Sequence, residues 1–117
     1  MQPLLGVRFF RSAAGTEPVR EWLRDLPVEH RRAIGTDIKT VQYGWPLGMP
    51  LVRKLEPGLW ELRSHIADGI ARVLFTVHGA DLVLLHGFIK KSGRIPVDEL
   101  DTARQRLALF SRWADRD

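Results

Sequence analysis

The sequence predicts a single α+β domain in which an antiparallel meander sheet is covered by an N-terminal helical hairpin and followed by a C-terminal helix. Residues 59–90 contain three consecutive strand-like runs, and the Asp68-Gly69 pair between the first two is typical of a tight hairpin. Two segments before these runs and one after them repeat apolar residues at helical spacing. The predicted element order is β-α-α-β-β-β-α, with helices and sheet in separate layers.

The composition limits the protein to a narrow class. A chain of 117 residues can bury one hydrophobic core, so we expect residues 1–117 to form one domain. Cysteine is absent, which excludes disulfides and thiolate metal ligands. No apolar run approaches the roughly 20 residues of a membrane span. The N-terminal residues lack the pattern of a signal peptide. We therefore expect a cytoplasmic protein that does not associate with membranes.

The N-terminal third is predicted to form a strand and two helices. Residues 4–11 are a short β-prone run. Thr16 is the predicted N-cap of a helix over 17–26, because acidic residues and proline favour the first turn that follows it. A second helix is predicted over 27–43 from its apolar side at helical spacing. Together the two helices form a hairpin that should cover one face of the sheet.

The remaining elements follow from breakers and apolar runs. Residues 44–50 contain two glycines and two prolines and are expected to form a loop. Residues 51–56 lead through Pro57-Gly58 into the meander. The run over 82–90 is nearly continuous in apolar residues, which is typical of a strand in the middle of a sheet. A final helix is predicted from Pro96 to about residue 113.

The positive charge of the chain is concentrated in the predicted sheet. The net charge is +4, which favours an anionic partner. Residues 53–94 hold seven cations and four acids, whereas residues 17–32 hold four of each. The helical hairpin is therefore neutral, and the meander carries most of the excess.

Strand alternation gives the first meander strand a polar face, formed by Glu61, Arg63 and His65. Arg72 interrupts an apolar run in the next strand. It either pairs with a carboxylate such as Glu61 or faces a functional site. His65 is the best candidate for a group that titrates near pH 7. His86 lies within an apolar run and is predicted to be a hydrogen-bonded core residue.

The chemistry of such a face is that of a polyanion site. The sequence has no ligand spacing typical of a metal site and no phosphate-binding glycine loop, so we expect neither a metal nor a cofactor. Guanidinium groups bind phosphate oxygens bidentately and stabilise charge on a pentacoordinate phosphorus. RNA supplies its own nucleophile, the 2′-hydroxyl. The cations would suit RNA cleavage and simple RNA binding equally well.

Several segments in a fixed order resemble a known family. WELR, ARVLF, LLHGFIKKS and a helix of the form PxxELxxAxxRL follow one another here. This order resembles the RelE/HigB-like toxins of bacterial type II toxin–antitoxin systems, and it is most similar to their phage-derived HigB-like branch in the RelE/ParE superfamily. The similarity covers most of the chain and implies a RelE-like fold.

The resemblance implies a metal-independent endoribonuclease that cuts mRNA in the A site of the 30S ribosomal subunit and so inhibits translation. The expected catalytic residues are Arg63, Arg72, Lys91 and His65, and the expected RNA-binding residues are Lys54, Lys90 and Arg94. Several relatives have a tyrosine or histidine shortly after the basic pair, whereas residues 92–95 contain neither. Proton transfer would therefore fall to His65 or a lysine.

The resemblance also implies a partner, usually a helix-turn-helix antitoxin encoded next to the toxin. Two other functions stay open. ParE-like members of the superfamily inhibit DNA gyrase by binding it and cleave nothing. An inactive phage-derived protein could also keep only the ability to bind an antitoxin. Intact mRNA together with a gyrase defect would favour the first of these.

Overall fold

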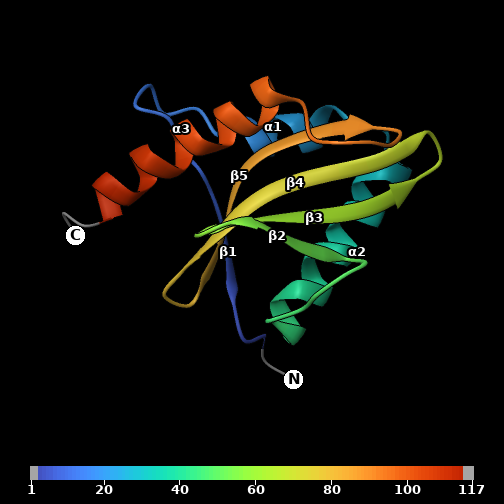
Figure 1. Cartoon of the computed structure of the whole chain (residues 1–117), viewed down its shortest axis with the longest axis horizontal. Coiled ribbons are helices and arrows are strands. Elements are labelled where there is room, and N and C mark those ends of the chain that lie inside the picture. Colours follow the sequence, from blue (N-terminus) through green and yellow to red (C-terminus); the bar gives the residue numbers. More distant parts are fainter. Residues whose placement is uncertain (1–2, 115–117) are drawn as a thin grey trace.

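The computed structural model describes residues 3–114, which form a five-stranded sheet with helices on both faces (Figure 1). Across the sheet the strand order is β1-β5-β4-β3-β2. The α+β class predicted from the sequence is confirmed. In chain order the elements are β1 (Gly6–Phe9), α1 (Pro18–Asp25), α2 (Val28–Gly44), β2 (Val52–Glu56), β3 (Leu59–Ile66), β4 (Gly69–His78), β5 (Asp81–Lys90) and α3 (Val97–Ala114).

Two features of the sheet differ from the prediction. Val52–Glu56, expected only to lead into the meander, forms the additional strand β2, which pairs antiparallel with β3. This strand was not predicted because it contains several charged residues and lacks a clear apolar alternation. Charged side chains are nevertheless common on short edge strands. In addition, β1 lies parallel to β5, so the sheet is mixed rather than antiparallel throughout. No hairpin joins β1 to β5, so nothing local imposes an antiparallel pairing.

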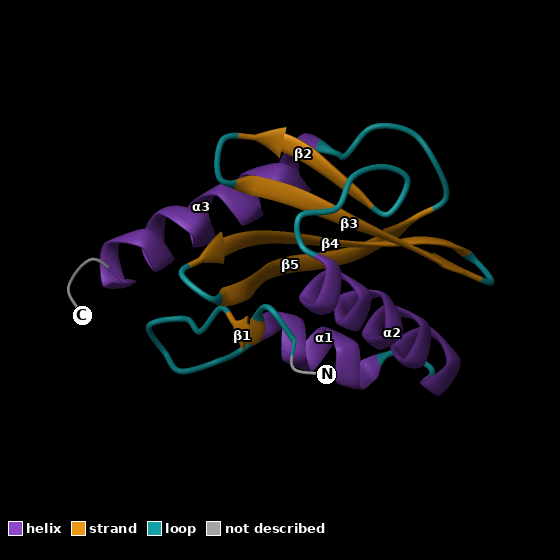
Figure 2. Cartoon of the chain, turned by 90° about the horizontal axis from the view of Figure 1, so that it is seen from below, coloured by secondary structure: helices purple, strands orange, loops and turns teal. Residues whose placement is uncertain are grey.

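The helices divide the core into two parts. Figure 2 shows α1 and α2 on one side of the sheet and α3 on the other. Val19, Ile34 and Val41 of the helical hairpin are fully buried, as their spacing predicts. On the other side, Ala103 and Phe110 of α3 are buried against β4 and β5. Within residues 3–114 no helix is long and apolar enough to cross a membrane.

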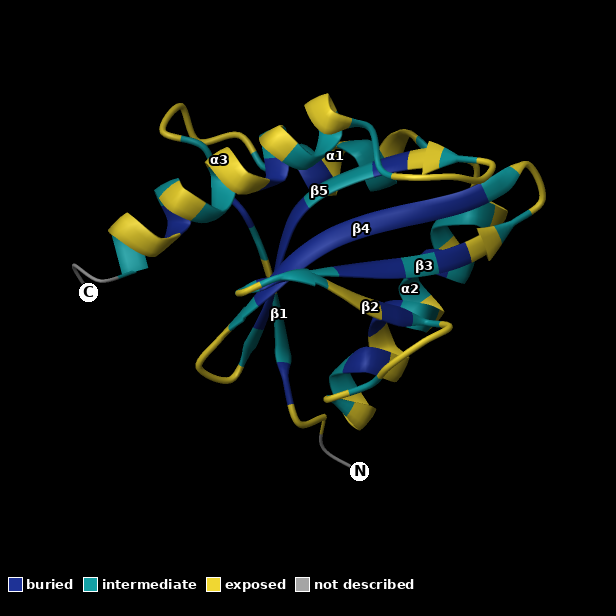
Figure 3. Cartoon of the chain, viewed as in Figure 1, coloured by how far each residue is buried: buried dark blue, intermediate teal, exposed yellow. Residues whose placement is uncertain are grey.

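The central strands are the most buried part of the molecule (Figure 3). As predicted, β5 lies inside the sheet, between β1 and β4. The predicted cap of the first helix is wrong by one residue, since Glu17 occupies the N-cap position of α1. The Thr16 hydroxyl instead lies 2.7 Å from the Ser12 hydroxyl and stabilises the preceding turn.

Gly87 allows Trp22 of α1 to lie directly on β5, since a Cβ at this position would overlap the indole ring. Gly87→Ala is expected to lower the free energy of unfolding by about 1–3 kcal/mol, because an overpacked side chain must shift its neighbours. Urea denaturation measures this change. Gly35→Ala in α2 is the matched control, because its new methyl group would meet no atom within 4 Å. There the better helix former should raise stability, by up to about 1 kcal/mol. A Gly87→Ala protein as stable as the wild type would contradict the packing of Trp22.

Candidate functional site

The face of the sheet that carries α3 is covered at one end only. α3 packs near Leu59, Leu74 and Leu85, and the opposite half of β3, β4 and β5 has no helix over it (Figure 1). We call this uncovered part the open face. Strand register and alternation place on it Arg53, Glu61, Arg63, His65, Arg72, Phe88 and Lys90.

Two arginines face each other at the centre of the open face. Arg63 on β3 is directly opposite Arg72 on β4. The Arg63 N–H donates to the Leu51 carbonyl on the β2 side, at 2.8 Å, so the two arginines form a cross-strand pair without mutual backbone hydrogen bonds. Pairs of this kind have the closer Cα separation, about 4.5 Å. Like charges directly opposite each other are destabilising, so this arrangement needs a neighbouring anion.

Glu61 supplies that anion within the protein. Its side chain is 0% exposed and accepts a hydrogen bond of 2.8 Å from Arg72 Nη1. Arg53 Nε lies 3.4 Å from the other carboxylate oxygen, within ion-pair distance but outside hydrogen-bond geometry. The pairing of Arg72 with Glu61, one of the two interpretations of the sequence, is confirmed. Two guanidinium groups, those of Arg53 and Arg72, share this carboxylate, and with Arg63 opposite Arg72 the local charge is +2.

Several hydrogen-bond donors of this cluster have no partner among the described residues. Arg72 is only 2% exposed, yet its Nε and Nη2 have no hydrogen-bond partner among the described residues. The same holds for the buried Nε of Arg63. Buried polar groups are paired in the great majority of cases, and unpaired ones need an explanation. A cationic cluster with spare donors has the chemistry of an anion site.

The structure brings some of the other predicted residues to this cluster. His65 is exposed and lies two residues beyond Arg63 on the same face of β3. Lys90 lies in the same cross-strand row, with Ile70 between them. Lys91 follows β5 and is exposed, and its backbone lies against the first residue of β4.

Two predicted residues lie apart from the cluster. Arg94 is exposed in the connector before α3. Lys54 alternates with Arg53 along β2 and therefore lies on the opposite face, where its Nζ is 5.7 Å from the centre of the Trp60 ring. Arg53, rather than Lys54, is the β2 cation that lies on the open face.

His86 is a hydrogen-bonded core residue, as predicted. Its Nε2 is 3.0 Å from a Glu99 carboxylate oxygen, and Arg106 Nη1 lies 3.3 Å from its Nδ1. Arg106 Nη1 also donates to the Leu85 carbonyl at 2.8 Å, and partial burial lowers the pKa of this guanidinium. Both imidazole nitrogens are therefore engaged in joining α3 to β5.

Sequence reasoning missed two residues of the open face. Arg53 was not placed there because β2 was not recognised, and without that strand its register against Glu61 is undefined. Phe88 lies opposite Arg72 and stacks on His86, with ring centres 5.7 Å apart. In the sequence Phe88 is one of several consecutive apolar residues of a buried strand. The sequence therefore does not indicate that it lies opposite Arg72. Among residues 3–114, no group of three or more acidic or histidine side chains could hold a metal ion.

Comparison with known families adds to this geometry. Residues 21–108 match the family described as Phage derived protein Gp49-like (DUF891). The chain belongs to this family. The match includes all residues of the open face and of the connector that follows β5. The Gp49-like family is associated with RelE-like toxins of toxin–antitoxin systems, and the expected resemblance is confirmed at that level. No curated protein matches the chain.

Proposed function

We propose that this Gp49-like protein is a toxin of the HigB-like type, an endoribonuclease that cleaves mRNA in the ribosomal A site without a metal ion. One observation carries the proposal. Arg63 and Arg72 oppose each other across two strands, Arg72 binds the carboxylate of Glu61, and both arginines have donors without a partner among the described residues. A phosphate bound at Arg63 would offset the repulsion between the two arginines, and its charge-assisted hydrogen bonds to the Arg63 guanidinium would be strong.

In this proposal the 2′-hydroxyl of the RNA attacks the adjacent phosphorus and the bond to the 5′-oxygen breaks, which leaves a 2′,3′-cyclic phosphate. Arg63 contacts the phosphate and stabilises the charge that grows on it. Arg72 acts from beneath, because its burial keeps it behind the surface. His65 accepts the proton of the 2′-hydroxyl and Lys91 donates one to the leaving oxygen. Neither residue has a carboxylate partner among the described residues that would neutralise it.

The same proposal assigns the surrounding cations to RNA binding. Lys90 and Arg94 lie near the end of β5 and extend the positive surface beyond the cleavage site. Lys54 lies on the other face of the sheet. It would contact RNA only if the bound RNA passes around the edge of β2. The toxin would be held inactive by an antitoxin, the partner that family membership suggests.

Primer extension on a defined mRNA in a purified translation system tests the activity. The wild type is expected to leave a cut within the A-site codon. Lys91→Ala should reduce that cut by about 100-fold, because it removes a group that acts in the transition state. Arg24→Ala is the matched control, since it removes one exposed positive charge from α1, on the other side of the sheet.

Intact mRNA with all three proteins would contradict the ribonuclease, and a gyrase supercoiling assay would then test the alternative. Equal cutting by Lys91→Ala and Arg24→Ala would leave the ribonuclease in place but exclude Lys91 from its site.

A further inference from the structure

The outer edge of β3 is only half covered. β2 pairs with β3 as far as Leu62, and the last backbone bond on this side joins the Arg63 N–H to the Leu51 carbonyl. β3 nevertheless continues to Ile66. Alternate residues of an antiparallel strand direct their N–H and C=O to the same side. The backbone groups of His65 therefore point outward, where no strand of the described chain lies.

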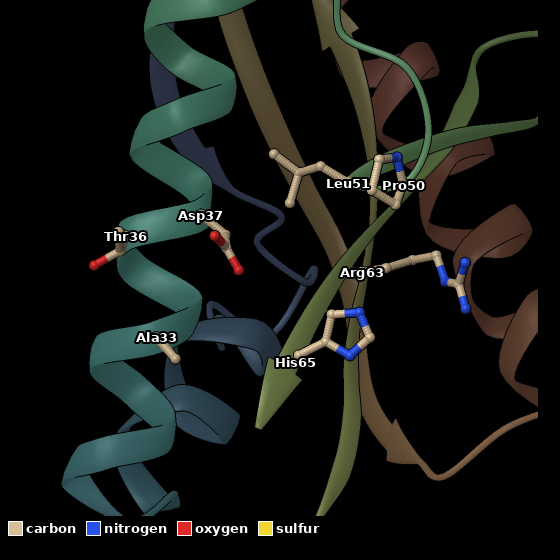
Figure 4. A pocket seen from close by; sticks show the side chains of 7 residues that line it. All are labelled: Ala33, Thr36, Asp37, Pro50, Leu51, Arg63 and His65. Carbon is tan, nitrogen blue, oxygen red and sulfur yellow. The ribbon is translucent and has the colours of Figure 1, made fainter. Parts of the chain in front are cut away.

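A groove runs along this free edge. It consists of two cavities, of about 450 and 550 Å³, that share Ala33 of α2 and His65 of β3 as lining residues. Figure 4 shows the first cavity, with Asp37 pointing into it from α2 and Arg63 extending away from α2. The second cavity continues along His30 and Ile66 toward the turn after β3. We call this continuous hollow the edge groove.

The geometry points to an extended segment of a partner polypeptide as its occupant, and we propose that such a segment adds to β3 as a further strand. An unpaired strand edge offers a row of donors and acceptors that another strand can satisfy. The opposite wall makes RNA a poor occupant, because Glu29 and Asp37 line the groove with carboxylates that repel phosphate.

The two faces of the sheet determine which types of side chain the added segment should carry. A residue paired with His65 would lie on the open face, diagonal to Arg63, where a carboxylate is complementary to the local positive charge. Its neighbours along the segment would point to the other face, into the hollow beside Ala33, which favours small apolar side chains. The preferred pattern is therefore apolar, acidic, apolar at successive positions.

His30 adds an independent observation. Its side chain is 13% exposed, its Nδ1 has no hydrogen-bond partner among the described residues, and its Nε2 is 3.9 Å from an Asp68 oxygen. A buried imidazole nitrogen that lines the groove without a partner can hydrogen-bond a polar group of the incoming segment.

Binding would have a consequence for activity, and this part alone rests on the proposed function. The acidic side chain of the segment would occupy the position beside Arg63 that the RNA phosphate needs. A partner bound at the edge groove would therefore exclude RNA by competition for the same charge. Binding of the segment itself does not depend on any nuclease activity.

The experiment uses a fluorescent synthetic peptide, Thr-Glu-Val-Glu-Val-Glu-Val-Thr, and measures its Kd by anisotropy without RNA. His65→Pro removes the outward N–H together with the imidazole, and proline is tolerated on edge strands where the N–H faces solvent. His65→Thr is the matched control, because it loses the imidazole but keeps the N–H. We expect His65→Thr to bind within about threefold of wild type and His65→Pro at least tenfold more weakly.

As a control for folding, the backbone amide NMR signals of β4 and β5 in both variants are compared with those of wild type. If His65→Pro does not fold, the same peptide methylated on alternate backbone nitrogens takes its place and should bind wild type at least tenfold more weakly than the parent. Equal binding by both variants, or by the methylated peptide, would overturn the proposal. A second peptide has the same composition with its glutamates grouped at one end. If it binds wild type as tightly as the alternating peptide does, binding is due to charge attraction alone and the proposal is overturned. A wild-type dimer without peptide binding, seen by sedimentation, would assign the edge to a second copy.

Discussion

Arg72→Ala is expected to lower the free energy of unfolding by about 3–5 kcal/mol, which is the range for breaking a buried ion pair by removing one partner. Glu61 would remain fully buried, with Arg53 as its nearest cation at 3.4 Å and no hydrogen bond from it. A carboxylate in that position must either stay charged without adequate solvation or become protonated. Chemical denaturation monitored by circular dichroism measures the loss.

A double variant separates the fold from the activity. Arg72→Met with Glu61→Leu removes both charges and fills their volume, and such replacements of buried pairs are often neutral or stabilising. Arg53 is 47% exposed at its side chain, so it can turn toward solvent once Glu61 is gone. We expect stability to return while cleavage stays lost. An Arg72→Ala protein with wild-type stability would contradict the buried pair.

Arg63→Ala is expected to show the opposite behaviour, with cleavage reduced by about 100- to 1000-fold and stability unchanged or raised. The rate should fall because a donor that stabilises the transition state is removed. Stability should not fall, because the substitution also removes a like charge directly opposite Arg72. Single-turnover cleavage of ribosome-bound mRNA measures the first effect, and denaturation measures the second.

Arg63→Lys is the informative control for this position. It keeps the charge but loses the planar fork that binds two phosphate oxygens at once. We expect its rate to lie between those of wild type and Arg63→Ala. A rate for Arg63→Ala equal to that of Arg24→Ala, which changes the other side of the sheet, would place the cleavage site elsewhere.

Much of the fold could be predicted because periodicity and turn residues are local signals. The predicted hairpin at Asp68-Gly69 joins β3 to β4 in the structure, since these two residues are a local turn signal. The position of β5 inside the sheet followed from its continuous apolar run. The helices were placed to within about a turn, since their apolar faces repeat at helical spacing.

What could not be predicted depends on contacts between distant segments. β2 has five residues and gains its strand character from pairing with β3, so its own composition carries little signal. The parallel pairing of β1 with β5 joins two strands that are far apart in the sequence. Neither is encoded in any single window of sequence.

The candidate site shows the same division. Alternation put Arg63 and His65 on one face, and that part required no more than the strand itself. The burial of Glu61 between two arginines depends on the register of three strands, which no local pattern supplies. The position of Lys54 on the far face also depends on strand register. A shift of one residue along a strand moves each side chain to the other face of the sheet.

The placement of Arg72 inside the sheet has a consequence for how this protein could lose the toxic activity proposed for it. Genetic changes at exposed cations would leave an intact protein able to bind and occupy its antitoxin. Changes at Arg72 would instead remove the protein itself, because cells degrade chains that unfold readily. Survivors of expression should therefore fall into two groups, distinguished by whether the protein still accumulates. Among the described residues, the most buried cation is thus the one whose loss leaves the least protein in the cell.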